Sequence, residues 1–161
     1  MDARMTDDFP GTDLCKLSVD GCVANVTMAR SEVYNALNTQ LISELIEIIE
    51  WTTQRSVGAT KSLNDPSGNP YLRVVVLGSE GRHFCAGADI NMMRDAGAAT
   101  PEENRRDSER LDRLFNSLWS HPCFTIGRVQ GVALGGGAGL VACLDHVIAE
   151  PSTRIALSEG K

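Results

Sequence analysis

Alternating apolar and polar residues predict two short strands near the start of the chain. The segments 14–19 and 22–28 both alternate in this way, and Asp20-Gly21 between them is a typical turn of a β-hairpin. The segment 71–77 is almost continuously apolar, which predicts a strand covered on both faces of a parallel sheet. Three shorter apolar runs predict further strands, namely 124–129, 146–149 and 154–157.

Apolar residues spaced three and four apart predict two amphipathic helices. The first covers residues 39–54 with Asn38 as its N-cap, and the second covers residues 101–121 and ends before Pro122. The pattern places three glutamates of the first helix away from its apolar face, namely Glu44, Glu47 and Glu50. Residues 55–70 combine glycine, proline and small polar residues, which predicts a surface loop insertion without secondary structure.

The order of these elements predicts the fold class. Strands that alternate with helices favour an α/β protein with a mainly parallel sheet and right-handed crossovers. Residues 1–13 are polar and acidic, and we expect them to form a flexible N-terminal segment ahead of one domain over residues 14–161. Because the sequence stops directly after the last predicted strand, we expect the C-terminal part of that domain to be missing.

Composition and charge limit the classes of function. The net charge of the 161 residues is −6, which argues against a nucleic-acid partner or an anionic membrane surface. No apolar run reaches the roughly 20 residues that cross a bilayer. The N-terminus lacks the features of a secretory or transit signal, so the predicted location is the cytoplasm. The cysteines form no Cys-x-x-Cys pair and no two histidines lie four residues apart, which predicts a reducing compartment and no metal site.

Three consecutive glycines, Gly135 to Gly137, lie between a strand and a helical segment predicted at 138–144. Glycines at such a turn let a ligand approach the backbone, and the free N–H groups of the first helical turn then face it. A P-loop is excluded because Gly137 and Ala138 occupy its lysine and serine or threonine positions. A dinucleotide fingerprint is excluded because its third glycine falls on Leu140. The pattern favours an oxyanion or phosphate cradle, with close packing of a helix on the sheet as the alternative.

A second glycine loop, Gly87-Ala88-Asp89, follows the strand predicted at 71–77. Two loops of this kind can place backbone N–H groups around one carbonyl oxygen, which is the geometry of an oxyanion hole. We therefore interpret the two loops as parts of one site.

Three motifs give the sequence a family resemblance. The segments 83–90 (HFCAGADI) and 130–137 (QGVALGGG) resemble the two signatures of the crotonase, or enoyl-CoA hydratase/isomerase, superfamily, and Asn35-Ala36-Leu37 is similar to a third family feature. The similarity extends over about residues 14–161. It implies a ClpP-like spiral fold of repeated ββα units and a homo-oligomer that is a trimer or a dimer of trimers. It also implies acyl-CoA thioester chemistry through an enolate, with no cofactor apart from the coenzyme A of the substrate.

The resemblance also implies roles for individual residues. The amides of Ala88 and Gly136 would bind the thioester oxygen and stabilise the enolate. Five residues would form the acyl-CoA site, namely Ala86, Gly87, Ala88, Asp89 and Gly136. Asp89 has an alternative interpretation as a plain turn residue, since aspartate is favoured in turns.

Family hydratases often carry two glutamates, one just after the glycines and one further along. The first of these positions is Gly139 in this chain, and the second is Glu159. The resemblance makes Glu159 the expected general acid/base. Partial burial would raise the pKa of its carboxyl towards neutrality, which suits proton transfer. A solvated glutamate near the chain end is the alternative.

The reaction that these residues favour is addition of water to an α,β-unsaturated acyl-CoA, or its reverse. The segment from Gly139 to Cys143 resembles the methylglutaconyl-CoA hydratases of leucine breakdown, which makes 3-methylglutaconyl-CoA a candidate substrate. Double-bond isomerisation needs a single proton shuttle and is the enzymatic alternative. A truncated, non-catalytic fragment that only binds acyl-CoA is the other.

Overall fold

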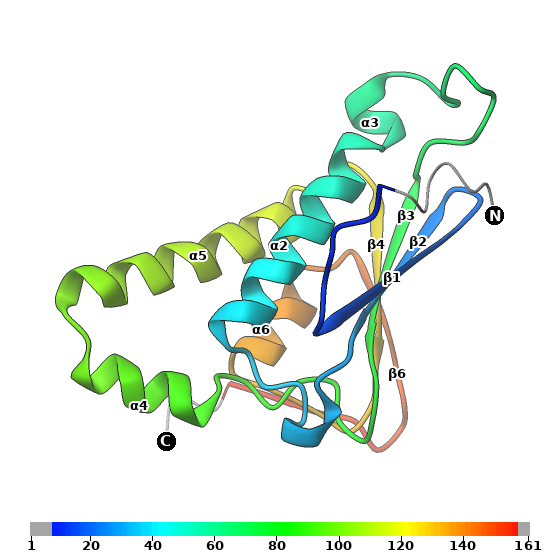
Figure 1. Ribbon diagram of the computed structural model, residues 1–161. Helices are drawn as coiled ribbons and strands as arrows, with labels where there is room; N and C mark the ends of the chain where they lie inside the picture. The colour runs from blue at the N-terminus through cyan, green and yellow to red at the C-terminus, as the bar shows by residue number, and fades with distance from the viewer. Residues whose placement is uncertain (1–7, 158–161) are drawn as a thin grey trace.

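Two sheets are present in the computed structural model, which describes residues 8–157. The large sheet has the strand order β1-β2-β3-β4-β6, and the small sheet pairs β5 with β7. β1 and β2 are antiparallel and the other strand pairings are parallel, so the predicted hairpin and mainly parallel sheet are confirmed (Figure 1). The strands are β1 (Cys15–Asp20), β2 (Val23–Met28), β3 (Val74–Ser79), β4 (Phe124–Val129), β5 (Val132–Leu134), β6 (His146–Ala149) and β7 (Arg154–Ala156).

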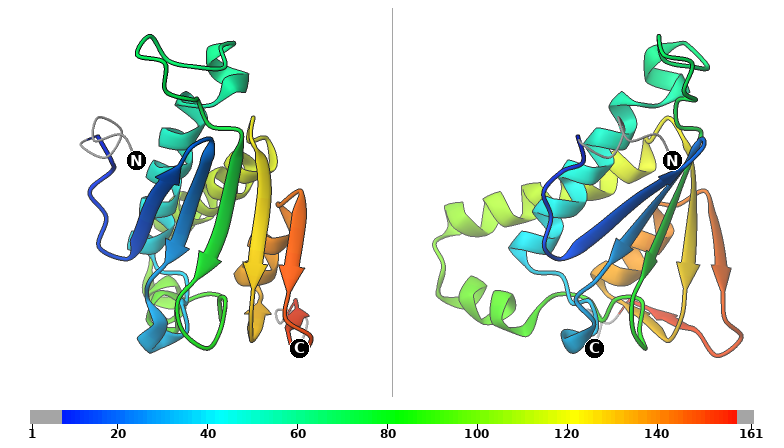
Figure 2. Two further views of the ribbon diagram at one scale, coloured as in Figure 1. Left: turned by 90° about the vertical axis from the view of Figure 1, so that its right-hand side faces the viewer. Right: turned by 45° about the vertical axis from the view of Figure 1, so that its right-hand side comes forward.

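Helices α2, α5 and α6 lie on one face of the large sheet, which stands in front of them in the left view of Figure 2. The helical elements are η1 (Ser31–Val33), α2 (Thr39–Gln54), α3 (Val57–Thr60), α4 (Ile90–Ala98), α5 (Pro101–Trp119) and α6 (Gly136–Ala142). In β3, Val75 and Leu77 face these helices and are 1% and 2% exposed, whereas Val74 and Val76 are only partly buried. The prediction that this strand is covered on both faces is wrong within residues 8–157, because no second layer packs on its outer side.

Helix α2 begins and ends where the sequence predicts. The side chain of Asn38 accepts a hydrogen bond from the Leu41 amide at 2.8 Å, which satisfies one free N–H of the first turn. The apolar side chains of the helix join the core beneath the sheet, and Leu41, Leu45 and Ile48 are all 0% exposed. The periodicity therefore identified both the helix and its buried face.

Glu44 is buried, contrary to the prediction that it lies away from the apolar face of α2. The residue is 7% exposed, and its carboxylate accepts hydrogen bonds from the amides of Asp13 at 3.0 Å and Leu14 at 2.8 Å. Gln40, one turn earlier, donates to the same carboxylate at 3.0 Å. Glu44 thus holds the residues just before β1 against helix α2. Helical periodicity does not predict these partners, because they belong to another segment of the chain.

Replacing Glu44 by alanine is expected to lower the free energy of unfolding by about 2–3 kcal/mol, because two backbone amides lose a charged acceptor. Urea denaturation followed by circular dichroism measures the change. Glu47→Ala is the matched control, since Glu47 is exposed on the same helix. Its loss is expected to change stability by less than about 0.5 kcal/mol. Equal effects of the two substitutions would contradict the role given to Glu44.

The segment 55–70 is not the loop without secondary structure that was predicted, because it contains α3. Ser56 is 0% exposed and caps this helix by accepting a hydrogen bond from the Ala59 amide at 3.0 Å. A Cβ on Gly58 would lie 2.6 Å from the Cβ of Pro122, so this glycine permits close packing. Composition alone did not distinguish a packing glycine from a turn glycine.

Residues 8–13 precede β1 and lie against α2. The rings of Phe9 and Trp51 meet edge to face with their centroids 5.1 Å apart, and the Trp51 indole donates to the Asp8 carbonyl at 2.8 Å. Part of the segment expected to be flexible therefore packs on the domain. Residues 1–7 lie outside the described residues.

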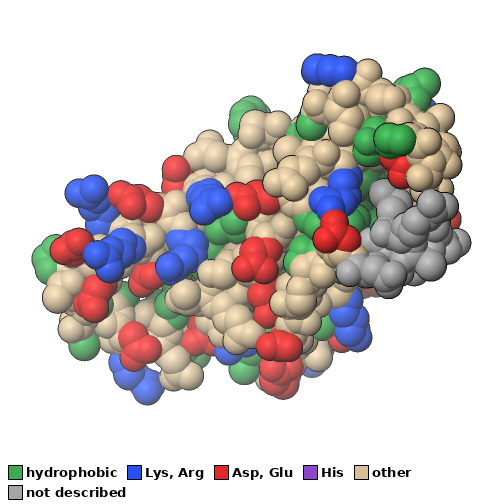
Figure 3. Space-filling view, turned by 45° about the horizontal axis from the view of Figure 1, so that its top comes forward, with side chains coloured by type: hydrophobic (Ala, Val, Ile, Leu, Met, Phe, Trp, Pro, Cys, Tyr) green, Lys and Arg blue, Asp and Glu red, His purple; other side chains and the backbone are tan. Residues whose placement is uncertain are grey.

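The start of α5 carries charges of both signs. Thr100 and Glu103 form a capping box, and three ion pairs follow along the helix: Arg105 with Glu109, Arg106 with Glu102, and Arg110 with Asp107. Figure 3 shows basic and acidic side chains interspersed at this end of the molecule. Charges of both signs in this arrangement are typical of a solvated helix face. None of the described helices is long and apolar enough to cross a membrane.

Candidate functional site

The two glycine loops that were interpreted as one site lie in backbone contact. Cys85 pairs with Ala133 as in a parallel sheet. The Cys85 amide donates to Val132 at 3.1 Å, and the Leu134 amide donates to Cys85 at 3.0 Å. Directly after this pairing β5 ends, and the chain turns at Gly135, with φ of 52°, into α6. The loop before α4 and the turn before α6 therefore lie side by side.

Glycine is required where these loops meet. A Cβ on Gly137 would lie 2.4 Å from the Cys85 carbonyl oxygen, and a Cβ on Gly87 would lie 2.8 Å from the Leu134 carbonyl oxygen. Gly87 also has φ of 97°, which residues with a side chain rarely adopt. The close-packing alternative considered for the three glycines thus describes Gly137.

The amide of Ala88 points away from the neighbouring segment. In a parallel bridge, the Leu37 amide donates to the Gly87 carbonyl at 2.7 Å and the Asp89 amide donates to the Leu37 carbonyl at 2.9 Å. Successive residues of an extended segment direct their amides to opposite sides, so the Ala88 amide faces away from Leu37. Ala88 is exposed, and none of residues 8–157 accepts a hydrogen bond from its amide.

Gly136 supplies a second free amide. It is the first residue of α6, and the bond that opens this helix runs from the Gly139 amide to the Gly135 carbonyl at 3.0 Å. In the described part of the chain, the Gly136 amide has no acceptor. A Cβ on Gly136 would lie 2.9 Å from Cδ1 of Leu37, so Leu37 contacts both loops. Free amides on two adjacent loops are the elements from which an oxyanion hole is built.

The motif Asn35-Ala36-Leu37 stabilises the segment that leads into the first loop. Asn35 is 0% exposed and has φ of 55°, a backbone conformation that asparagine tolerates better than most residues. Its Oδ1 accepts from the Arg30 amide at 2.8 Å, and its Nδ2 donates to the carbonyls of Glu80 and His83, both at 2.9 Å. One side chain thus satisfies three backbone groups, two of which belong to the segment that leads into the loop.

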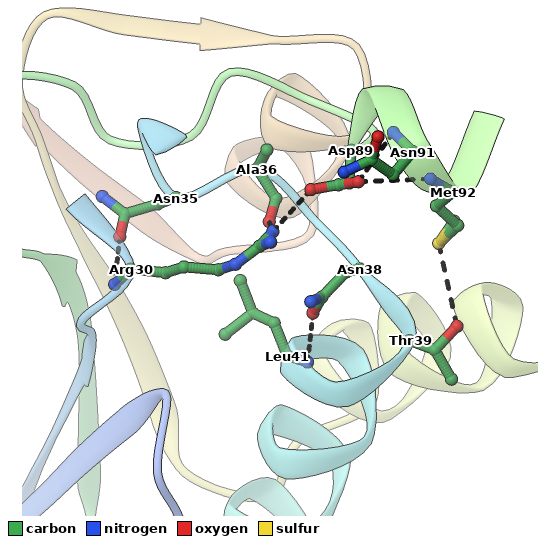
Figure 4. A network of polar contacts seen from close by, with 9 residues as sticks. All are labelled: Arg30, Asn35, Ala36, Asn38, Thr39, Leu41, Asp89, Asn91 and Met92. Carbon is green, nitrogen blue, oxygen red and sulfur yellow. Dashed lines mark hydrogen bonds and ion pairs between the residues drawn. The ribbon is translucent and has the colours of Figure 1, made fainter. Parts of the chain in front are cut away.

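Asp89 lies in the first loop with its side chain turned into the protein (Figure 4). The residue is 6% exposed. Its carboxylate accepts from the amides of Asn91 at 2.9 Å and Met92 at 3.1 Å, and from Nη1 of Arg30 at 2.8 Å. Burial acts to raise the pKa of the Asp89 carboxyl, but Arg30 and the two amides outweigh it and hold the pKa below its ordinary value. The charged side chain therefore caps α4, and a contact with a ligand would come from the backbone.

The structure brings together the residues that were expected to bind acyl-CoA: Ala86, Gly87, Ala88, Asp89 and Gly136. The Ala86 amide donates to the Tyr34 carbonyl at 3.0 Å, so within residues 8–157 it is not a free donor as the Ala88 amide is. Arg30 is the charged partner of this loop, and none of the sequence motifs includes it. Neither its position nor its partner could be read from a local motif.

Gly139, where family hydratases often carry a glutamate, has little room for a side chain. A Cβ there would lie 2.7 Å from Cζ of Phe115 on α5. The other expected carboxylate, Glu159, lies outside the described residues. β7 ends at Ala156, whose carbonyl accepts from the Gly135 amide at 2.9 Å. The end of β7 therefore lies beside the glycine turn.

A recess of about 700 Å³ opens between the start of α2 and helices α4 and α5. Its lining is mostly polar and charged and includes Arg30, Asp89 and Arg106, but neither Ala88 nor Gly136. Within residues 8–157, no group of three histidine, cysteine, aspartate or glutamate side chains is arranged to hold a metal ion.

A profile of the enoyl-CoA hydratase/isomerase family matches residues 18–161. The chain belongs to this family. An enoyl-CoA hydratase of known structure from Shewanella pealeana is 32% identical, with a TM-score of 0.80 over 92% of this chain and 51% of that one. The enoyl-CoA isomerase/hydratase of Mycosarcoma maydis is 29% identical over 86% of this chain and 48% of its own length. The mevalonyl-coenzyme A hydratase of Beauveria bassiana is 29% identical over 84% of this chain and 45% of its own.

These relatives confirm the predicted crotonase fold class, since the match in structure covers nearly all of this chain. The chain spans about half the length of the relatives that it matches.

Proposed function

We propose that the chain binds an acyl-CoA thioester and stabilises its enolate at the amides of Ala88 and Gly136. The proposal is based on two free amides, one on each loop. The two loops are in such close contact that Gly137 has no room for a Cβ. Donors that are fixed before the reaction stabilise charge as it develops on the thioester oxygen. One such donor lowers the barrier by about 3–4 kcal/mol.

The proposed reaction is hydration of an α,β-unsaturated acyl-CoA. The oxygen of water bonds to the β carbon while negative charge moves onto the thioester oxygen, where the Ala88 and Gly136 amides hold it. A proton then reaches the α carbon, and the carbonyl re-forms. We assign Glu159 as the general acid/base, because one carboxylate can take a proton from water and return one to carbon. Because residue 139 is a glycine, it supplies no second carboxylate, which favours a mechanism with a single one.

The proposed acyl group is 3-methylglutaconyl, an intermediate of leucine catabolism. Its support is the resemblance of residues 139–143 (GLVAC) to methylglutaconyl-CoA hydratases. The mevalonyl-coenzyme A hydratase of Beauveria bassiana is a relative whose name gives a different acyl group, so fold and family do not by themselves select one. We further propose a cytoplasmic homo-oligomer, a trimer or a dimer of trimers, that acts in fatty-acid or leucine metabolism.

Double-bond isomerisation is the second candidate function. It needs one group that removes a proton from one carbon and returns it to another, so a single carboxylate is sufficient. The crowded position of Gly139 is equally compatible with it. The relative from Mycosarcoma maydis carries both activities in its name.

Assays with four thioesters test these functions in the purified chain. Acetoacetyl-CoA forms an enolate that absorbs in the near ultraviolet, and we expect this absorbance to rise on binding. Hydration is followed as loss of the enoyl-thioester absorbance of crotonyl-CoA and 3-methylglutaconyl-CoA, and isomerisation as its gain from a 3-enoyl-CoA. No enolate signal would refute the oxyanion hole. An enolate signal without turnover would identify a chain that only binds acyl-CoA.

A further inference from the structure

Arg30 joins the two segments that form the bridge between Leu37 and Ala88. Its side chain is 15% exposed, and its Nη1 donates to the Ala36 carbonyl and to Oδ2 of Asp89, both at 2.8 Å. Ala36 precedes Leu37, and Asp89 follows Ala88. One nitrogen atom of Arg30 therefore binds both the residue before Leu37 and the residue after Ala88, as Figure 4 shows.

This contact restrains the direction of the Ala88 amide. The bridge consists of two hydrogen bonds, from the Leu37 amide to the Gly87 carbonyl and from the Asp89 amide to the Leu37 carbonyl. Within residues 8–157 no hydrogen bond reaches the backbone of Ala88 itself. Loss of the guanidinium would leave the Asp89 carboxylate buried without its cation, which is unfavourable. The carboxylate would relieve this by moving towards water. A movement of Asp89 would loosen the bridge to Leu37, which also holds the Gly87 carbonyl of the peptide group that carries the Ala88 N–H.

We infer that Arg30 is a positioning residue that holds the Ala88 amide in the direction needed to bind a thioester oxygen. The inference rests on the proposed function, and Arg30 itself touches neither the substrate nor the reacting atoms. The two N–H bonds of Nη1 lie at a fixed angle in the guanidinium plane, which suits two acceptors at once. The flexible ammonium of lysine lacks this geometry, so Arg30→Lys tests geometry and Arg30→Gln tests charge.

The first measurement needs no ligand. Nitrogen-15 relaxation of the Ala88 amide is compared between the native chain, Arg30→Gln, Arg30→Lys and the control Arg113→Gln, which removes an exposed arginine paired with Glu50. We expect a lower order parameter for Ala88 in both Arg30 variants and the native value in the control. An Ala88 amide as ordered as in the native chain would overturn the inference. Arg30→Lys keeps the test decisive if Arg30→Gln fails to fold.

The second measurement follows catalysis and binding. In Arg30→Gln we expect kcat to fall about tenfold to a hundredfold, the scale of a small misplacement of a catalytic group. The enolate fraction of bound acetoacetyl-CoA should fall with it, while the affinity for free coenzyme A is unchanged. A proportional loss of coenzyme A affinity would instead indicate general structural damage and contradict the inference. If the native chain shows no enolate signal, the proposed function fails, and the order parameter of Ala88 still decides the positioning role.

A double variant separates an indirect role from an independent one. If Arg30 acts through Asp89, then Arg30→Gln combined with Asp89→Asn should lose no more of the enolate signal than the larger single loss. Additive losses would show that the two side chains act separately and would refute the positioning role.

Discussion

Alanine at position 137 is expected to abolish acyl-CoA binding and to lower the free energy of unfolding by about 3 kcal/mol. Its Cβ would lie 2.4 Å from the carbonyl oxygen of Cys85 and 2.9 Å from the Cys85 Cβ. Cys85 is 0% exposed, so no rotation of a flexible side chain relieves the overlap. The two loops must separate, which moves the Gly136 amide away from Ala88. Urea denaturation and titration with acetoacetyl-CoA measure the two effects.

Gly97→Ala is the matched control for this substitution. Gly97 also lies in a helix, and a Cβ there would meet nothing within 4 Å. Because alanine favours a helix over glycine by about 1 kcal/mol, we expect Gly97→Ala to retain binding and to be slightly more stable. Native stability and native binding in Gly137→Ala would show that the two loops are not in the contact described.

Glu159→Gln is expected to lower turnover by about 10²-fold to 10⁴-fold, the usual contribution of general acid/base catalysis. The amide of glutamine can neither accept the proton of water nor deliver one to carbon. Binding should be retained, because the thioester oxygen is held by the Ala88 and Gly136 amides. Steady-state assay of the enoyl-thioester and titration with acetoacetyl-CoA separate the two quantities.

Glu150→Gln is the control for Glu159→Gln, since Glu150 is exposed between β6 and β7. We expect native turnover from it. Unchanged turnover in Glu159→Gln would place the acid/base elsewhere in the chain. Loss of binding together with turnover would assign Glu159 a structural role and contradict its role in proton transfer.

Sequence patterns over a few neighbouring residues were sufficient to identify most of the helices and strands. Asn38 and the apolar spacing that follows it defined α2, and Asp20-Gly21 defined the hairpin of β1 and β2. The three glycines at 135–137 located the turn into α6. These signals are local because caps, turns and amphipathic faces depend on residues a few positions apart. Helix α4 was not predicted, and its apolar residues Ile90 and Met93 are exposed, so they mark no buried face.

The sequence by itself determined the α/β class, the order of most of the elements and, through three motifs, the family and the two loops of the candidate site. Only the tertiary structure decided which side chains those loops depend on. It also decided three contacts between distant segments: Glu44 with the amides of residues 13 and 14, Gly139 against Phe115, and Arg30 with Asp89. Each is set by which segments meet after folding, and the spacing of neighbouring residues carries no information about a partner brought close by a distant part of the chain.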